Sequence, residues 1–543
     1  MIKTKTILSA LALCSAFAAQ ANDFDTAYNS FNKAKIKQDI KTLSSDAFEG
    51  REPSGVGEKM TTDMLIERFK ALGLTPGNGN SFTQAVPMVS IVSTPTKGLQ
   101  IADMEFGFLK NYVANSRKTQ ETIGLKDSEL VFVGYGIHAP EYGWNDYKGL
   151  DVKGKTVVVL VNDPGYATQD PKLFEGNTMT YYGRWIYKYE EAARQGAAGA
   201  IIVHETAPAS YGWNVIESSW SGAQYHLPAK EVNEPAIDVE MWITTDKAET
   251  LFKKAGLSFQ DMKKQALNKS FKAKSLGLTA NISLKNEIKS STSNNVLATI
   301  QGSEKPDEHV VFMGHWDHLG APMVNGEKVI YNGAHDNATG TAGLLHIAKA
   351  FQALGKKPKR SITFAAVTAE EQGRLGSRYF ANHPSVPLNK IVGLINMDSL
   401  DITGLKTDVT VTGYGKSELE TYLAEAAKRQ NRTLVAEETP ERGYYYRSDH
   451  FSLAKKGVPA LSAGGGTQWL NANEKAIGER VSASVAKCYH QACDVYDENW
   501  GWDGLVAELQ LFFETGYLLS ESGQWPNWRQ GTEFKAARDA MMK

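Results

Sequence analysis

A chain of 543 residues is longer than one hydrophobic core usually supports, so two or three domains are expected. Its 42% hydrophobic and 22% charged residues are typical of a soluble, folded protein. The formal net charge of −2 gives no electrostatic reason to expect nucleic acid or an anionic membrane as a partner.

The first 21 residues have the pattern of a secretory signal peptide. Lys3 and Lys5 precede an apolar run from Ile7 to Ala18, and Ala19-Gln20-Ala21 fits a cleavage site with small residues. A membrane anchor is disfavoured because the run is shorter than the roughly 20 apolar residues that span a bilayer. We therefore predict a periplasmic or secreted protein that is free of the membrane after cleavage.

Residues 22–99 are predicted to be the helical N-terminal part of the main domain. Apolar residues recur at helical spacing from Ile36 to Leu43 and from Met60 to Phe69, with a turn-rich segment between the two runs.

Residues 100–285 differ, because short apolar runs predict buried strands at 129–136, 156–161 and 200–203. A helix is predicted between the last two of these strands, from Tyr187 to Gln195. No cluster of metal-binding or nucleophilic residues occurs there, so an inserted structural domain is expected.

Residues 286–543 alternate between strands and helices. Strands are predicted at 309–313, 362–367, 391–395 and 458–461, and a helix at 339–354. Continuous apolar strands that alternate with helices indicate an α/β fold with a mainly parallel sheet covered by helices on both faces.

Histidine and acidic residues follow three of these strands directly. The first strand is followed by His315, Asp317 and His318, the second by Glu370 and Glu371, and the third by Asp398. Functional groups gather at the carboxyl ends of strands in open α/β sheets, so these side chains are expected to meet. Asp336 lies in the next loop, just before the predicted helix.

Crowded carboxylates raise one another's pKa unless a cation neutralises them, and no cluster of Lys or Arg stands beside these motifs. Imidazole mixed with carboxylate is a ligand set that zinc takes. Two Zn²⁺, three carboxylates and one bridging hydroxide are formally neutral, so a site for two zinc ions is predicted.

Five segments in order resemble the zinc-dependent exopeptidase family of the bacterial leucyl aminopeptidases and glutamate carboxypeptidases, which also includes the transferrin receptor. The similarity covers roughly residues 290–500. The segments are Gly314-His315-x-Asp317, Gly333-x-x-Asp336-x-x-x-Gly340, Glu370-Glu371-x-Gly373-x-x-Gly376-Ser377, Asn396-Met397-Asp398 and Tyr489-His490.

The resemblance implies a role for each matching residue. One zinc ion would be held by Asp336, Glu371 and His490, and the other by His315, Asp336 and Asp398, with Asp336 shared. Glu370 would be the general base, and Asp317 would orient His315.

A second similarity concerns the substrate pocket and the insertion. The segment Ser448-Asp449-His450 resembles a family signature near the pocket, and Tyr445 or Tyr446 before it would donate a hydrogen bond to the oxyanion. Arg447 either binds a substrate carboxylate or pairs with a neighbouring acid. Residues 100–285 resemble the protease-associated domain that some family members carry.

Several alternatives stand beside this prediction. His318 competes with His315 as a ligand, and His335 competes with Asp336. A carboxypeptidase or a glutaminyl cyclase of the same fold, or a non-catalytic binding protein, would share most of the motifs. All five ligand positions and Glu370 keep competent side chains, which favours an aminopeptidase that acts on peptides.

Two cysteines remain after the signal peptide, Cys488 and Cys493, and they flank His490. An oxidising compartment permits a disulfide between them, and the alternative is two free thiols.

Overall fold

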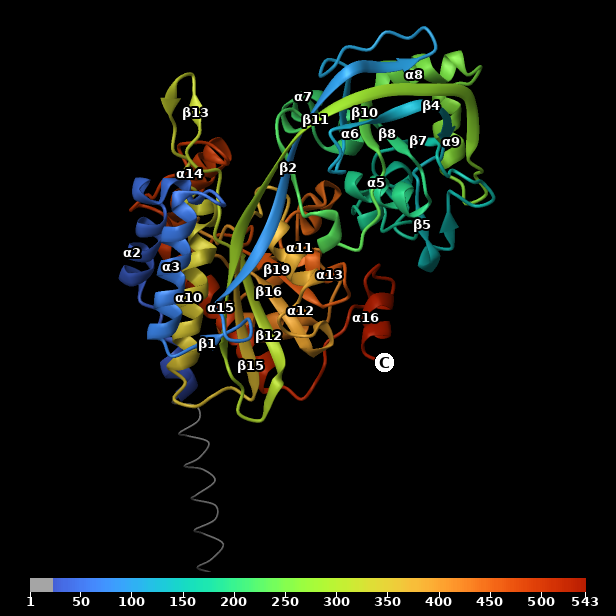
Figure 1. Cartoon of the computed structure of the whole chain (residues 1–543). Coiled ribbons are helices and arrows are strands. Elements are labelled where there is room, and N and C mark those ends of the chain that lie inside the picture. Colours follow the sequence, from blue (N-terminus) through green and yellow to red (C-terminus); the bar gives the residue numbers. More distant parts are fainter. Residues whose placement is uncertain (1–22) are drawn as a thin grey trace, which may run out of the picture. The chain divides into compact units, whose positions relative to one another are not determined.

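The computed structural model describes residues 23–543 (Figure 1). The predicted signal peptide, residues 1–21, lies outside the described residues. Within the described part, no helix is long and apolar enough to cross a membrane.

The chain divides into two compact units. The first contains the described residues as far as Val86 together with Thr292–Glu437 and Ser448–Lys543. The second contains Pro87–Ser291 and Glu438–Arg447. The domain limits expected from the sequence, 22–99, 100–285 and 286–543, stay predictions.

The first unit contains a mainly parallel sheet flanked by helices, which confirms the predicted α/β fold. Strands β12, β15, β16 and β19 form its parallel centre, β17 runs antiparallel to β19, and β11 runs antiparallel to β15. The order is β18 (Thr433–Ala436), β17 (Asp408–Thr412), β19 (Ala460–Gly464), β16 (Ile391–Asn396), β12 (Lys305–His315), β15 (Arg360–Val367) and β11 (Lys274–Ile300).

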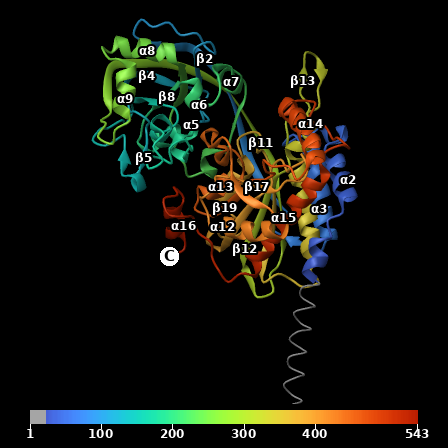
Figure 2. The ribbon, with the colours of Figure 1, turned by 180° about the vertical axis from the view of Figure 1, so that it is seen from behind.

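Helices cover both faces of this sheet. On one side, α10 (Thr339–Gln352) and α15 (Trp502–Glu521) pack on the central strands and on each other, and α2 (Lys33–Leu43) and α3 (Val56–Ala71) pack on α10. On the other side, α13 (His450–Ala454) packs on β16 and β19, with α11 (Leu375–Asn382) beside it. The two views of the ribbon show these layers (Figure 1, Figure 2).

The helical prediction for residues 22–99 is correct at α2 and α3 but wrong at its end. Thr83–Ile101 forms the long strand β2. Its sequence explains the difference, because Pro87 and Pro95 interrupt any helix and β-branched residues dominate between them.

The second unit has a sheet and an apolar core of its own. Strands β4, β7, β8 and β10 are parallel neighbours, β3 runs antiparallel to β10, and residues 274–285 of β11 run antiparallel to β4. The bounds are β3 (Tyr112–Asn115), β4 (Thr122–Phe132), β7 (Thr156–Leu160), β8 (Gly199–His204) and β10 (Val239–Thr244), with helix α5 (Trp185–Arg194) after β7. The strands and the helix predicted there are therefore present.

Candidate metal centre

The sheet register brings the predicted ligands to one edge. His315 is the last residue of β12 and pairs with Val367, the last residue of β15. Met313 of β12 pairs with Asn396, the last residue of β16. Each strand therefore ends at the same level, and the loops that carry Glu371 and Asp398 begin there.

Two groups of possible ligands share Asp336. In the first group, Nε2 of His315 lies 3.2 Å from Asp336 Oδ1 and 3.3 Å from Asp398 Oδ1. In the second, Nε2 of His490 lies 3.2 Å from Asp336 Oδ2 and 3.0 Å from Glu371 Oε2. The carboxylate of Asp336 thus directs one oxygen to each group, as a bridging ligand would.

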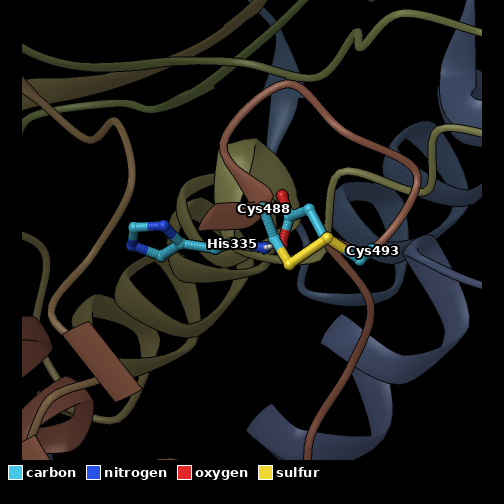
Figure 3. Close-up of a disulfide and its surroundings, with 4 residues drawn as sticks. His335, Cys488 and Cys493 are labelled. Carbon is cyan, nitrogen blue, oxygen red and sulfur yellow. Dashed lines mark hydrogen bonds between the residues drawn. A yellow bond between two sulfur atoms is a disulfide. The ribbon is translucent and has the colours of Figure 1, made fainter. Parts of the chain in front are cut away.

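His490 reaches the centre from the end of helix α14 (Ala472–Cys488). A disulfide joins Cys488 and Cys493, whose Cα atoms are 5.1 Å apart, and closes the short loop that carries His490 (Figure 3). The sequence left a disulfide and two free thiols as alternatives, and the structure has the disulfide. By closing this loop, it limits the positions that His490 can take.

His318 lies in the second group as well. Its Nδ1 is 2.7 Å from Glu371 Oε1, and the side chain is fully buried. The atoms of His318, Asp336 and Glu371 lie close enough together to hold an ion. Its Nε2 makes no hydrogen bond to any described residue, so His318 is either a positioning residue for Glu371 or a further ligand. His335 instead directs Nε2 to the carbonyl oxygen of Leu400, at 3.1 Å.

Asp317, two residues after the end of β12, is hydrogen-bonded to the turn that carries Glu370, the predicted general base. Its carboxylate accepts hydrogen bonds from the backbone N–H groups of Glu370 (3.1 Å) and Glu371 (3.4 Å). The same carboxylate lies 3.7 Å from Nδ1 of His315, and Asp317 is fully buried. Nδ1 of His315 lies 3.1 Å from the backbone carbonyl oxygen of Asp317, so this residue positions the imidazole through its backbone and the Glu370–Glu371 turn through its carboxylate.

The surroundings of Glu370, the predicted general base, raise its affinity for a proton. Burial raises the pKa of Glu370 well above its usual range, and the carboxylates of Asp449, Asp398 and Glu371 raise it further, whereas His315 opposes the rise. A carboxyl group in such a place holds a proton more tightly than one in water. This is the property that a general base needs if it is to return the proton to a leaving group.

The carboxylates also raise the pKa values of the two histidines, and this favours the charged form of each imidazole. Burial alone would lower the pKa of His490, but its hydrogen bonds to Asp336 and Glu371 raise that pKa to about 10. The carboxylates of Asp398 and Asp336 likewise raise the pKa of His315 well above its usual range, against the effect of burial. The cluster attracts positive charge, either as protons on the imidazoles or as metal ions.

Sequence reasoning missed Arg51, a fully buried arginine of the first unit. Its guanidinium donates hydrogen bonds of 2.7–2.8 Å to four backbone carbonyl groups. These belong to Leu43, Trp316, Asn332 and Gly333. Burial lowers the pKa of Arg51 to about 10, while nearby carboxylates, including Asp317 and Asp336, oppose this effect. Arg51 therefore stays charged at neutral pH and joins two ligand-bearing loops.

Two further positioning residues hold the Asp336 loop. The carboxylate of Asp494 accepts hydrogen bonds from the backbone N–H groups of His335 (3.0 Å) and Asp336 (3.1 Å). The side-chain amide of Asn337 donates to the carbonyl groups of His315 (3.2 Å) and Met397 (3.0 Å). Such contacts with backbone groups leave no pattern in the sequence.

The Ser448 signature and helix α3 also support the site. Ser448 donates a hydrogen bond of 2.5 Å from its hydroxyl to Asp398 Oδ2. Glu58 of α3 accepts hydrogen bonds of 2.8 Å from the side chains of Ser293 and Asn294, and the Ser293 hydroxyl lies 2.6 Å from that of Thr368. The loop after β15 is therefore fixed from the N-terminal part of the chain.

The predicted substrate-binding residues Tyr445, Tyr446 and Arg447 belong to the second unit. Tyr445 and Tyr446 are buried there, with ring centres 5.6 Å apart. Arg447 is exposed, donates to the carbonyl oxygen of Arg442 at 2.7 Å and lies over the ring of Tyr444. Their role in binding a substrate stays a prediction.

The donor chemistry fits zinc. Each group offers imidazole nitrogen and carboxylate oxygen, which are ligands of catalytic zinc. The shared, buried Asp336 suits two cations that lie close together. Both candidate groups among the described residues lie in the first unit.

Comparison with known proteins agrees with this chemistry. Residues 295–513 match the family model described as peptidase family M28. "Aminopeptidase NAALADL1" from Mus musculus is 37% identical over 136 residues, which make up 24% of this chain and 16% of that protein. A "Probable zinc metalloprotease" from Pyrenophora tritici-repentis is 32% identical over 152 residues, 27% of this chain and 31% of that one. The chain thus spans less than a third of either relative.

The fold has a solved counterpart. The structure "Aminopeptidase from Aneurinibacillus sp. strain AM-1" aligns with a TM-score of 0.50 and 19% sequence identity. The alignment covers 92% of this chain and 97% of that chain. The two proteins therefore share a fold over most of their length.

Proposed function

We propose that the protein is a zinc-dependent aminopeptidase that removes N-terminal residues from peptides, because residues 295–513 match the model of peptidase family M28. The observation that carries the proposal is the shared carboxylate of Asp336, which faces His315 on one side and His490 on the other. Beside this pair of sites stands Glu370, a buried acid with a raised pKa.

The proposed ligands are divided between two zinc ions. His315, Asp336 and Asp398 would hold one ion, and Asp336, Glu371 and His490 the other. Zinc, when bound, supplies a Lewis acid that polarises a peptide carbonyl and eases the ionisation of water.

The protein's own residues supply the proton chemistry. Glu370 takes a proton from the attacking water onto a carboxylate oxygen and then gives it to the nitrogen of the leaving amine. Asp317 keeps the Glu370–Glu371 turn in place through its two backbone hydrogen bonds. His318 holds Glu371 through a hydrogen bond of 2.7 Å, so that its other oxygen remains directed at His490.

The test is hydrolysis of a panel of aminoacyl-p-nitroanilides by the purified mature protein, with chelator and with zinc added back. We expect cleavage that chelator abolishes and zinc restores. Glu370→Gln should lower kcat by roughly 100- to 10,000-fold with zinc content unchanged. Glu425→Gln, a change at an exposed glutamate of the same unit, should have no effect.

Other outcomes point to other functions. A folded protein that binds two zinc ions yet cleaves only N-terminally blocked peptides would be a carboxypeptidase. One that cyclises N-terminal glutamine would be a glutaminyl cyclase. A folded protein that binds no metal would overturn the proposal.

We also propose that the protein is exported and acts in the periplasm or outside the cell. The predicted signal peptide supports this, and so does the disulfide, since disulfides persist in oxidising compartments. N-terminal sequencing of protein recovered from the periplasm or the medium should begin at Asn22. Full-length protein retained in the cytoplasm with free thiols would contradict export.

A further inference from the structure

A cavity of about 440 Å³ opens beside the proposed metal site, within the first unit. Asp398 and His335 line it, together with residues of the 399–403 segment after β16 and of β17, β19, α14 and α15. Because Asp398 is a proposed zinc ligand, a substrate held there can extend a side chain into this cavity. The volume is in the range of cavities that bind small ligands.

The walls of this cavity combine hydroxyl and carboxylate groups with aliphatic surface. Thr410, Thr412, Ser462 and Ser482 contribute hydroxyl groups. The charged groups among the lining residues are carboxylates, those of Asp398, Asp401 and Glu508, and no described lysine or arginine lines it. Aminopeptidase pockets for leucine or phenylalanine would instead be expected to have apolar walls.

Glu508 is the carboxylate without a direct cationic partner. Only 2% of the residue is exposed. Its Oε2 accepts hydrogen bonds from the backbone N–H groups of Asp401 (2.9 Å) and Gly465 (3.2 Å). Its Oε1 accepts none from the residues that the structure describes. Burial, followed by the charge of Asp401, raises the pKa of Glu508 to about 7.

The other charges nearby are already paired. Lys406 lies 3.0 Å from Asp401 Oδ2 and also donates to Thr403. Arg432 donates to the carbonyl groups of Asp408 and Gly465 and lowers the pKa of Glu508 only from a distance. The carboxyl group of Glu508 therefore faces the cavity with no cation beside it among the described residues, and a cation in the cavity would stabilise its ionised form.

We propose that this cavity receives the side chain of the substrate's N-terminal residue and selects lysine or arginine through Glu508. The inference rests on the proposed aminopeptidase function and adds its substrate class. The hydroxyl groups of the walls hydrogen-bond the cationic head, and the aliphatic surface of Ile402, Val485 and the neighbouring alanines packs on its methylene groups.

The first experiment compares kcat/KM for the p-nitroanilides of lysine, arginine, leucine and norleucine with the zinc-loaded protein. We expect the basic substrates to exceed norleucine by at least tenfold. In Glu508→Gln, kcat/KM for the basic substrates should fall at least tenfold while that for norleucine changes less than threefold. Asp503→Asn, an exposed acid on the same helix, is the matched control. A parent protein that prefers norleucine or leucine would overturn the inference, as would an equal loss for all substrates.

Two variants at Ser482 test the same cavity without replacing the buried Glu508, whose loss could affect folding. Ser482 is an exposed residue of α14 at the cavity, so either charge can be placed there. The ratio of lysine to norleucine cleavage should rise about threefold or more in Ser482→Asp and fall by a similar factor in Ser482→Lys. An unchanged ratio in both variants would contradict the assignment.

A binding measurement distinguishes failure of the proposed peptidase function from failure of the proposed cavity. If no aminoacyl-p-nitroanilide is cleaved, calorimetric titration with lysinamide and norleucinamide measures the cavity directly. Tighter binding of lysinamide that is lost in Glu508→Gln would support the cavity and reject the peptidase activity. Equal binding of both amides would reject the cavity as a selective site.

Discussion

Replacing Arg51 with lysine should weaken both the fold and the metal site. The buried guanidinium forms four hydrogen bonds of 2.7–2.8 Å to backbone carbonyl groups, from its Nε, Nη1 and Nη2 atoms. Lysine keeps the charge but presents its donors from a single nitrogen, so it cannot reproduce the planar arrangement. Its three N–H donors cannot serve four carbonyl groups that surround a planar fork, and we expect two of the four to be left buried without a donor.

The size of the effect follows from those two groups. A hydrogen bond to a charged donor contributes about 1.5–3 kcal/mol, and a buried acceptor left without one costs about 1–3 kcal/mol. The free energy of unfolding of the first unit should therefore fall by about 3–5 kcal/mol. Trp316 follows the proposed ligand His315 and Gly333 precedes the proposed ligand Asp336, so zinc binding should weaken by about 10- to 100-fold.

Urea unfolding monitored by tryptophan fluorescence gives the stability, and competition with a chelator gives the zinc dissociation constant. Arg529→Lys is the control, because this arginine is 46% exposed and its nearest acid lies 3.9 Å away. The control should match the parent protein in both measurements. If Arg51→Lys also matches the parent, the hydrogen bonds of Arg51 contribute neither to stability nor to the position of the ligands.

Four shorter predictions concern other parts of the first unit. His318→Gln should weaken one zinc site by about 10- to 100-fold and leave the other intact, as measured by chelator competition; equal weakening of both sites would contradict its assignment to Glu371. Removing the disulfide by changing Cys488 and Cys493 to serine should lower the free energy of unfolding by about 2 kcal/mol, because the closed loop is short; an unchanged urea midpoint would refute this. Hydrogen bonds from His346 and Arg68 lower the pKa of Asp39 to about 2 against the effect of burial, so its ionised form stabilises the fold above pH 4. That contribution, about 2 kcal/mol, should disappear between pH 4 and pH 2 in the parent but not in Asp39→Asn, and parallel pH profiles of the two would disprove it. The preference for lysine over norleucine should rise from pH 6 to pH 8, because Glu508 ionises near pH 7; a flat ratio would exclude this role.

The sequence predicted the parts of the site that depend on strand ends. His315, Glu371 and Asp398 each follow a continuous apolar strand, and parallel strands deliver such residues to one edge. His490 was different, because it follows a long helix and no strand. Only the resemblance to a known family related it to the others.

The supporting residues could not be predicted, because their partners are backbone atoms. Arg51 lies in a turn more than 260 residues before Trp316, and any residue could supply the carbonyl group that it binds. Asp494 holds backbone N–H groups in the same way. Glu508 lies on helix α15, and its sequence neighbours do not reveal the cavity that it faces.

The hydrogen bonds of Glu58 and Arg51 also bear on how much of the chain is needed to hold the proposed metal site in place. Residues 295–513, the region shared with family M28, contain the five proposed ligands and Glu370 but neither Glu58 nor Arg51. In a fragment cut to those limits, the carbonyl groups of Trp316 and Gly333 lose their donor, and the hydroxyl of Thr368 loses its neighbour Ser293. A shortened protein should therefore retain α2 and α3, although neither helix carries a proposed ligand or the proposed base.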